Sequence, residues 1–184
     1  MPDTTTRQVR LAGTGGQGLG LAGRLLADAC VAAGHAVAQS QTYEPTSRGG
    51  SSRSDLVVAA GTVDYPLVTA LDALLLLDQA ALEDAPELLR DGALVVTDAA
   101  LVPRPPTVEV EVHALPLTAR ARELGNPRVA NMVGLGALVG LAGWPAFEQV
   151  EQAVVTSTPA RFRDLNLAAL RAGRALVATD ASAA

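Results

Sequence analysis

Apolar and polar positions in the first forty residues follow the order strand, glycine-rich loop, helix, strand. Val9–Ala12 is a short β-prone run. Beyond the glycine-rich loop, apolar or small residues recur at helical spacing, at Leu21, Leu25, Leu26, Ala29 and Ala33. Gly34 then has the character of a helix C-cap, and a second strand begins at Ala36. The pattern predicts one βαβ unit over residues 9–41.

Three more apolar runs predict strands over Ser54–Ala60, Leu71–Leu77 and Ala93–Thr97. The last two flank a predicted helix over Ala80–Arg90, and they are nearly continuously apolar, as parallel strands covered on both faces are. Val108–His113 instead alternates with a period of two, which is typical of an edge strand. We therefore expect an α/β, Rossmann-like fold, in which a mostly parallel sheet carries helices on both faces.

The last third of the chain predicts a helical part. Helical segments are expected over Thr118–Leu124, Val129–Leu141, Pro145–Val155 and Arg161–Val177. The uncharged stretch 129–147 approaches the length of a membrane span, about 20 residues. Its glycines and Asn131 favour instead a packed helix with a small-residue face, which a second helix approaches closely. We expect one domain over residues 1–184, with its core from about 8 to 175.

Composition narrows the classes of function. The chain has 14 basic and 19 acidic residues, and aromatic residues make up 3%, so neither phosphate attraction nor a stacking platform supports nucleic-acid binding. The single Cys30 excludes an internal disulfide and an iron–sulfur cluster held by this chain alone. The amino terminus carries an acid and no apolar run, so it does not resemble a secretory signal. The expected location is the cytoplasm.

The first candidate site is the glycine-rich loop at residues 13–18. Gly13, Gly15 and Gly18 have the G-x-G-x-x-G spacing between a strand and a helix, while Gly16 removes a further side chain and Gln17 is the one long polar group. Such a loop offers free amides and the positive end of a helix to a phosphate or carboxylate. It could equally serve only to join strand to helix, and spacing alone leaves both interpretations open.

The second candidate site is the loop after the second predicted strand. Arg48 precedes Gly49 and Gly50. Its guanidinium group offers several hydrogen-bond donors beside exposed backbone amides, a combination suited to a carboxylate or phosphate. A solvated turn with a surface arginine is the other interpretation. A nicotinamide dinucleotide would also require an acid at the end of the second strand, where the chain reads Gln39-Ser40-Gln41.

No other residues form a recognisable catalytic set. Cys30 falls on the apolar side of its helix, and His35 and His113 have no acid at a ligand or catalytic-pair spacing. Asp72 and Asp78 flank a strand without a visible partner. We therefore find no nucleophile, metal set or acid–base pair, and we expect the difficult chemistry to lie on another chain.

Taken together, the motifs resemble the gamma subunit of 2-oxoacid:ferredoxin oxidoreductases. The loop at 13–18 and its helix are similar to the family's opening, and segment 43–50, Tyr-Glu-Pro-Thr-Ser-Arg-Gly-Gly, is similar to its second loop. Residues 131–137, Asn166 and 172–173 also fit the family's pattern. Glu44 departs from it, since the family usually has glycine there. Indolepyruvate enzymes usually carry a different second loop, so the resemblance favours pyruvate, 2-oxoglutarate or a branched-chain 2-oxoacid.

The resemblance implies a complex. Its alpha and beta subunits would hold thiamine diphosphate and magnesium, an iron–sulfur subunit or domain would pass electrons to ferredoxin, and coenzyme A would accept the acyl group. This chain would hold none of the redox groups alone, and would help form the path of coenzyme A. Its site residues would be Gly13, Gly15, Gly16, Gln17, Gly18, Arg48, Gly49 and Gly50. The alternatives are a stand-alone dinucleotide-binding oxidoreductase and a purely structural assembly subunit.

Overall fold

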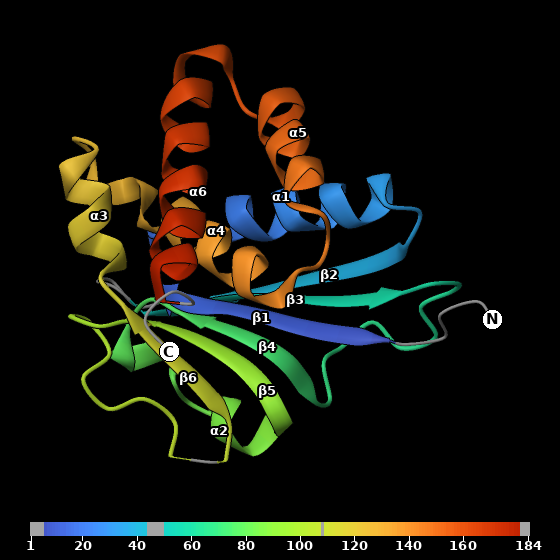
Figure 1. Cartoon of the computed structure of the whole chain (residues 1–184). Helices are drawn as coiled ribbons and strands as arrows, with labels where there is room; N and C mark the ends of the chain where they lie inside the picture. The colour runs from blue at the N-terminus through green and yellow to red at the C-terminus, as the bar shows by residue number, and fades with distance from the viewer. Residues whose placement is uncertain (1–5, 44–49, 108, 181–184) are drawn as a thin grey trace.

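The chain folds around one six-stranded sheet covered mainly on one face (Figure 1). The computed structural model describes residues 6–43, 50–107 and 109–180. The sheet has the order β2-β3-β1-β4-β5-β6. Its strands are β1 (Arg7–Thr14), β2 (Ala36–Tyr43), β3 (Ser51–Ala59), β4 (Leu71–Leu76), β5 (Leu89–Asp98) and β6 (Glu111–Leu115). The helices are α1 (Leu19–Ala32), α2 (Ala85–Leu88), α3 (Leu117–Glu123), α4 (Ala130–Ala142), α5 (Phe147–Ser157) and α6 (Ala160–Asp180), with short 3-10 turns η1 (Gln79–Ala81) and η2 (Pro127–Val129).

The prediction of a mostly parallel sheet is confirmed, with β3 as the exception. β1, β4, β5 and β6 pair in parallel, whereas β3 pairs antiparallel with both β1 and β2. β2 therefore runs parallel to β1 but is separated from it by β3. The prediction of a simple βαβ unit over 9–41 is wrong in this respect, because its two strands are not neighbours in the sheet. The short connection between β2 and β3 explains the difference, because it lets the chain return beside β2 as a hairpin does.

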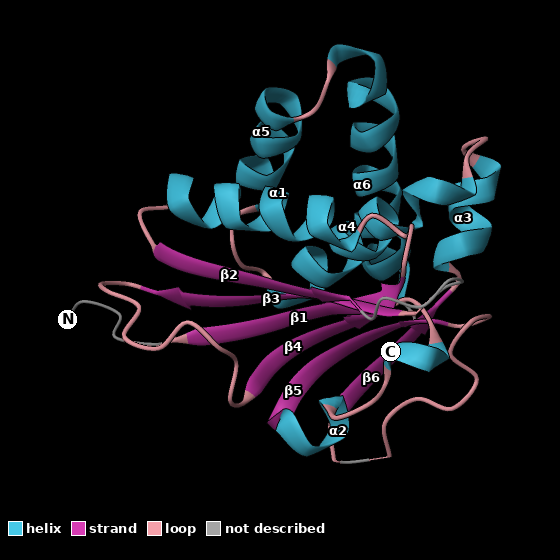
Figure 2. Cartoon of the chain, turned by 180° about the vertical axis from the view of Figure 1, so that it is seen from behind, coloured by secondary structure: helices cyan, strands magenta, loops and turns pink. Residues whose placement is uncertain are grey.

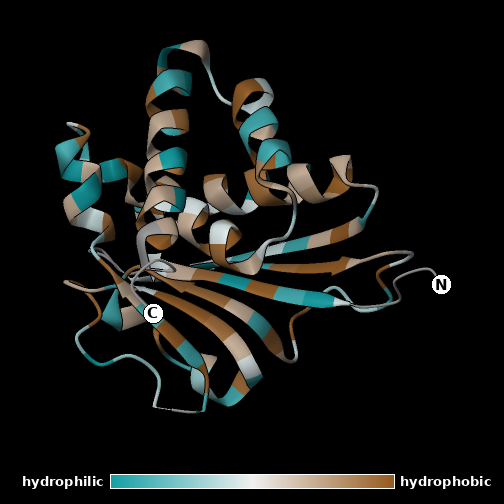
Figure 3. Ribbon diagram, viewed as in Figure 1, coloured by the Kyte–Doolittle hydropathy of each residue, from teal (hydrophilic) through white to brown (hydrophobic). Residues whose placement is uncertain are grey.

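The two faces of the sheet are covered unequally (Figure 2). Helices α1, α3, α4, α5 and α6 lie on one face, over the larger hydrophobic core. The other face carries a smaller cluster under η1 and α2. Most of the predicted helix over Ala80–Arg90 is absent: the backbone takes a positive φ at Glu83, and Leu89 already pairs with Leu71 of β4. Figure 3 shows the apolar character of the central strands.

A buried ion pair reinforces the thinly covered face. Arg10 is 3% exposed, and its Nε and Nη2 donate to the two carboxylate oxygens of Asp55 at 2.8 and 2.9 Å. Its Nη1 donates to Asp84 at 2.8 Å, which ties the residue before α2 to the sheet. Burial lowers the pKa of Arg10, but the two carboxylates outweigh it and leave the pKa raised. These hydrogen bonds link β1, β3 and the start of α2 on this face.

The four predicted C-terminal helices are all present. α4 corresponds to the predicted segment 129–141, for which a small-residue face is expected. A Cβ at Gly136 would overlap the carbonyl oxygen of Leu170 in α6, and a Cβ at Gly173 would overlap that of Val133 in α4. The two backbones therefore touch where they cross, as predicted. Nearly every residue of α4 is buried, which accounts for its lack of charge. Among the described residues, no helix is long and apolar enough to cross a membrane.

β6 is an edge strand, as predicted, but its bounds differ from the predicted ones. The prediction places the strand over Val108–His113, whereas the observed strand runs from Glu111 to Leu115 and, within the described part of the chain, pairs with β5 alone. Val108 itself lies outside the described residues.

Candidate functional site

The glycine-rich loop is closed by its own glutamine. The Thr14 amide donates to Gln17 Oε1 at 2.7 Å, the Gln17 amide donates to the Thr14 carbonyl at 3.2 Å, and Gln17 Nε2 reaches the Leu77 carbonyl at 3.4 Å. A Cβ at Gly13 would overlap Gln17 Oε1, so glycine there leaves room for this side chain. Gln17 thus fastens the loop to the end of β4, a role that the sequence did not reveal.

Two further glycines of the loop have left-handed backbones. Gly16 has φ of 91° with open space where a Cβ would stand, and Gly18, the N-cap of α1, has φ of 73°. A Cβ at Gly18 would lie 2.6 Å from Asn131 Nδ2, which donates to the Gly18 carbonyl at 2.9 Å. Asn131 is 4% exposed at the start of α4. It therefore joins two helix N-termini that are 113 residues apart in the chain.

The structure brings the glycine-rich loop into contact with Gly50, the described residue of the second candidate site. The Gly15 amide donates to the Gly50 carbonyl at 3.0 Å, at the edge where β1 ends and β3 begins. Gly15, Gly16 and Gly18 are exposed there, Gly50 is half-buried, and Gly13 is buried. Arg48 and Gly49 lie outside the described residues.

The loop leaves the amino end of α1 open. No side chain caps this helix, because its N-cap is Gly18. Among the described residues, the first-turn amides of Leu19 and Gly20 have no hydrogen-bond acceptor. Unpaired amides and the helix dipole together favour an anion at such a place.

The nearby acids are occupied within the chain. Asp98, 1% exposed, accepts hydrogen bonds from the amides of Ala100, Leu101 and Thr118 at 2.9, 3.2 and 2.7 Å. Asp78 accepts from the Ala80 amide at 2.9 Å. Their carboxylates hold the turns after β5 and β4 and the start of α3. At least one oxygen of each of these carboxylates is therefore engaged by backbone amides of its own turn.

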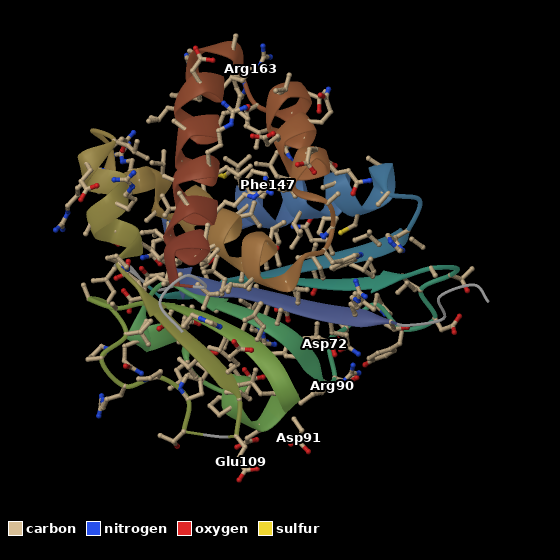
Figure 4. The ribbon with its side chains drawn as sticks, in the orientation of Figure 1. Asp72, Arg90, Asp91, Glu109, Phe147 and Arg163 are labelled. Atoms are coloured by element: carbon tan, nitrogen blue, oxygen red, sulfur yellow. The ribbon has the colours of Figure 1, made fainter. Side chains whose placement is uncertain are left out.

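The other titratable candidates lie elsewhere. Asp72, at the start of β4, accepts from the Gln8 amide at 2.7 Å and from Arg90 at 2.6 Å; Figure 4 shows Asp72 and Arg90 at the end of the sheet away from the glycine loop. His35 packs edge-on against Trp144, and His113 Nε2 lies 2.9 Å from Glu111. Within the described ranges, no three His, Cys, Asp or Glu residues are grouped so that they could hold a metal.

Cys30 is a core residue. It has no exposed surface, and burial raises the pKa of its thiol to about 12, although Arg7 acts in the opposite direction. A nucleophilic cysteine needs a lowered pKa and access to solvent. The environment of Cys30 therefore agrees with the structural role predicted for it.

The geometry disfavours a dinucleotide at this loop. In dinucleotide-binding folds, the second strand lies beside the first and its end holds the ribose. Here β3 takes that place. Gln39 and Gln41 of β2 turn toward α1, where Gln39 Nε2 donates to Ser54 Oγ at 2.8 Å and Gln41 packs against Gly20.

Comparison with known proteins agrees with this fold. The family model described as pyruvate ferredoxin/flavodoxin oxidoreductase matches residues 8–176. The chain is 36% identical to the 2-oxoglutarate synthase subunit KorC of Methanocaldococcus jannaschii, over 91% of each chain. It is 37% identical to the subunit of the same name from Methanothermobacter thermautotrophicus, over 93% of this chain and 95% of the relative.

Solved structures share the fold. The gamma subunit of the keto/oxoacid ferredoxin oxidoreductase of Geobacter sulfurreducens superposes with a TM-score of 0.86 at 36% identity, covering 95% of this chain and 98% of that one. A 2-oxoglutarate:ferredoxin oxidoreductase of Magnetococcus marinus, solved with 2-oxoglutarate, coenzyme A and succinyl-CoA bound, shares the fold at 23% identity and a TM-score of 0.83. This chain covers 32% of that longer chain.

The chain belongs to the pyruvate ferredoxin/flavodoxin oxidoreductase family, as the sequence motifs predicted. Within that family it is a gamma-type chain, a subunit of the 2-oxoacid:ferredoxin oxidoreductase class.

Proposed function

We propose that this chain is the gamma subunit of a 2-oxoglutarate:ferredoxin oxidoreductase and that its two joined loops bind a phosphate of coenzyme A. The observation that carries the proposal is the Gly15–Gly50 hydrogen bond, which unites the two glycine-bearing loops at the open end of α1. The choice of 2-oxoglutarate is supported by the relatives named 2-oxoglutarate synthase subunit KorC, at 36% and 37% identity over nearly the whole chain.

The described residues fit a phosphate group. The exposed Gly16 leaves open space at the loop, and the unpaired first-turn amides of α1 supply donors. Both carboxylate oxygens of the buried Asp98 are engaged by backbone amides, and one oxygen of Asp78 accepts from the Ala80 amide. Arg48, two residues before the fixed Gly50, would supply the positive charge. In this role the chain binds and orients the acyl acceptor, and partner subunits hold the thiamine, magnesium and iron–sulfur groups.

The test is Arg48→Ala in the assembled complex. Loss of a charge-assisted contact to phosphate should raise the KM for coenzyme A by about 10- to 100-fold, with kcat little changed. Arg171→Ala is the matched control, because Arg171 lies on α6 and pairs with Glu151. It should leave the KM unchanged.

Two results would count against the proposal. If the assembled Arg48→Ala enzyme has normal coenzyme A kinetics, Arg48 does not contact a phosphate of coenzyme A. A variant that fails to assemble while its isolated chain folds normally places the arginine at a subunit interface, and favours the assembly-only alternative. Substrate choice is tested separately, by comparing 2-oxoglutarate, pyruvate and branched-chain 2-oxoacids with the wild-type complex.

A further inference from the structure

Asn131, at the start of α4, is a buried residue whose side-chain amide is engaged at both of its polar atoms. The residue is 4% exposed. Its Oδ1 accepts from the Met132 amide at 2.9 Å, and its Nδ2 donates to the Gly18 carbonyl at 2.9 Å. The two bonds fix the orientation of the side chain, because an amide has one accepting atom and one donating atom. Asn131 therefore reaches from α4 to the N-cap of α1, on the same face of the sheet (Figure 1).

The Gly18 carbonyl is the first acceptor of α1. It accepts from the amides of Leu21 and Ala22, each at 3.1 Å, in addition to Asn131. Gly18 has no Cβ, so its own side chain does not restrict rotation of the peptide between Gly18 and Leu19. The bond from Asn131 adds a restraint on this peptide that comes from outside α1.

This restraint acts on a donor of the candidate anion site. A trans peptide is planar, and its N–H points away from its C=O. The Leu19 N–H belongs to the same peptide as the Gly18 carbonyl, so the direction of the carbonyl also sets the direction of the N–H. The carbonyl points into α1, where its acceptor bonds lie, and the Leu19 N–H points out of the amino end of the helix. This amide is one of those without an acceptor in the described part of the chain.

We propose that Asn131 is a positioning residue for coenzyme A, which holds the Gly18–Leu19 peptide so that the Leu19 amide is directed at the bound phosphate. This inference rests on the proposed function of the glycine-rich loop. Asn131 acts through Gly18, because its side chain is buried and both of its polar atoms have partners within the chain. Gln17 restrains the same loop from the end of β4, so the loop is held from two elements.

The test compares Asn131→Ala and Asn131→Asp in the assembled complex. The alanine variant loses the bond to Gly18, and the KM for coenzyme A should rise by about 5- to 10-fold, as expected for the loss of one buried hydrogen bond. The kcat at saturating coenzyme A and the KM for the 2-oxoacid should change little. The aspartate variant keeps the shape of the side chain and an acceptor for the Met132 amide, but it places a carboxylate oxygen against the Gly18 carbonyl. Its KM for coenzyme A should rise at least as far.

Asn126→Ala is the matched control. The Asn126 side chain accepts from the Arg128 amide in the turn that leads into α4, and it has no hydrogen bond to the glycine-rich loop among the described residues. The substitution removes the same type of side chain from the same region of the chain. It should leave the KM for coenzyme A unchanged.

The Arg48→Ala enzyme separates this inference from the function on which it rests. If Arg48→Ala raises the KM for coenzyme A and the Asn131 variants do not, Asn131 has no positioning role, while the proposed function stands. If neither position affects that KM, the proposed function is wrong and the role of Asn131 is wrong with it.

A purely structural role of Asn131 has a different signature. A lower kcat with an unchanged KM for coenzyme A would overturn the proposal. If the alanine variant does not assemble, the aspartate variant decides, because it preserves the volume of the side chain. Failure of both variants to assemble, while Asn126→Ala assembles normally, would also overturn the proposal.

Discussion

At the scale of single residues, Gly18 meets two independent requirements for glycine. Its φ of 73° is costly for any residue with a Cβ, and the same Cβ would press on Asn131 Nδ2. Gly16 meets only the first requirement, because its surroundings are open. The two positions therefore separate the cost of backbone conformation from the cost of a close contact.

We expect Gly18→Ala to lower the free energy of unfolding by about 2–3 kcal/mol and Gly16→Ala by about 1 kcal/mol, as measured in urea. Removing the Asn131 side chain in the Gly18→Ala background should recover part of the loss, so the two substitutions should not add. Equal effects of the two alanines would show that Asn131 does not constrain Gly18.

Thr97 is a buried residue whose hydroxyl has no partner among the described residues. Thr97→Val keeps its shape and removes the unpaired group, so the free energy of unfolding should stay the same or rise by about 1 kcal/mol. Thr158 is the control, because its buried hydroxyl donates to the Val154 carbonyl. Thr158→Val should lower the stability, and a loss of stability in Thr97→Val would contradict this account of Thr97.

The single thiol predicts a dependence on pH. Cys30 has a raised pKa of about 12 in the folded chain against an ordinary value of 9.0, so only the unfolded chain loses the thiol proton between these values. This contribution to stability is fully present below pH 9.0 and is lost as pH rises toward about 12. Urea unfolding of wild-type and Cys30→Ala chains should therefore diverge over that interval. Parallel curves would show that the thiol is not desolvated.

The chemistry at this scale is only partly visible in the sequence. The glycine spacing and Arg48-Gly49-Gly50 identify two segments, and the structure joins them through Gly15 and Gly50. Gln17 has the character of a ligand donor in the sequence, but its side-chain amide closes the loop. The contact of Asn131 with Gly18 spans 113 residues, and no local pattern reports a contact of that range.

At the scale of elements, the sequence predicts helices well where they bury an apolar face. It predicts them poorly where pairing with a neighbouring strand determines the secondary structure. The segment 80–90 has helical character, yet Leu89 pairs in the sheet and leaves a four-residue α2. The insertion of β3 between β1 and β2 is likewise a matter of strand partners, which apolar periodicity does not specify.

The sequence predicts that a second helix approaches α4 closely, because small residues permit it, and the structure shows that this helix is α6. Gly136→Ala should lower the free energy of unfolding by more than about 3 kcal/mol, since its Cβ would meet the backbone of Leu170. At Gly140 the nearest atom is a methyl of Val177, 3.0 Å from the Cβ position. Gly140→Ala should therefore change the stability little. Similar losses at both positions, measured by urea unfolding, would argue against backbone contact.

At the scale of the whole molecule, the proposed binding loops and the outer strand β2 lie at different edges of the sheet. The joined glycine loops lie where β1 ends, and the uncharged β2 borders the sheet. The thin covering of the second face, held by Arg10 and Asp55, leaves the strand ends in place without a second helical layer.

The most direct test of the central claim is ferredoxin reduction by the chain alone and by the complex copurified with it, each supplied with 2-oxoglutarate and coenzyme A. We expect no turnover by the chain alone. The complex should reduce ferredoxin with saturable dependence on coenzyme A, and should lose that activity when this chain is removed. Sustained turnover by the purified chain without partners, or undiminished activity of a complex that lacks it, would contradict the account.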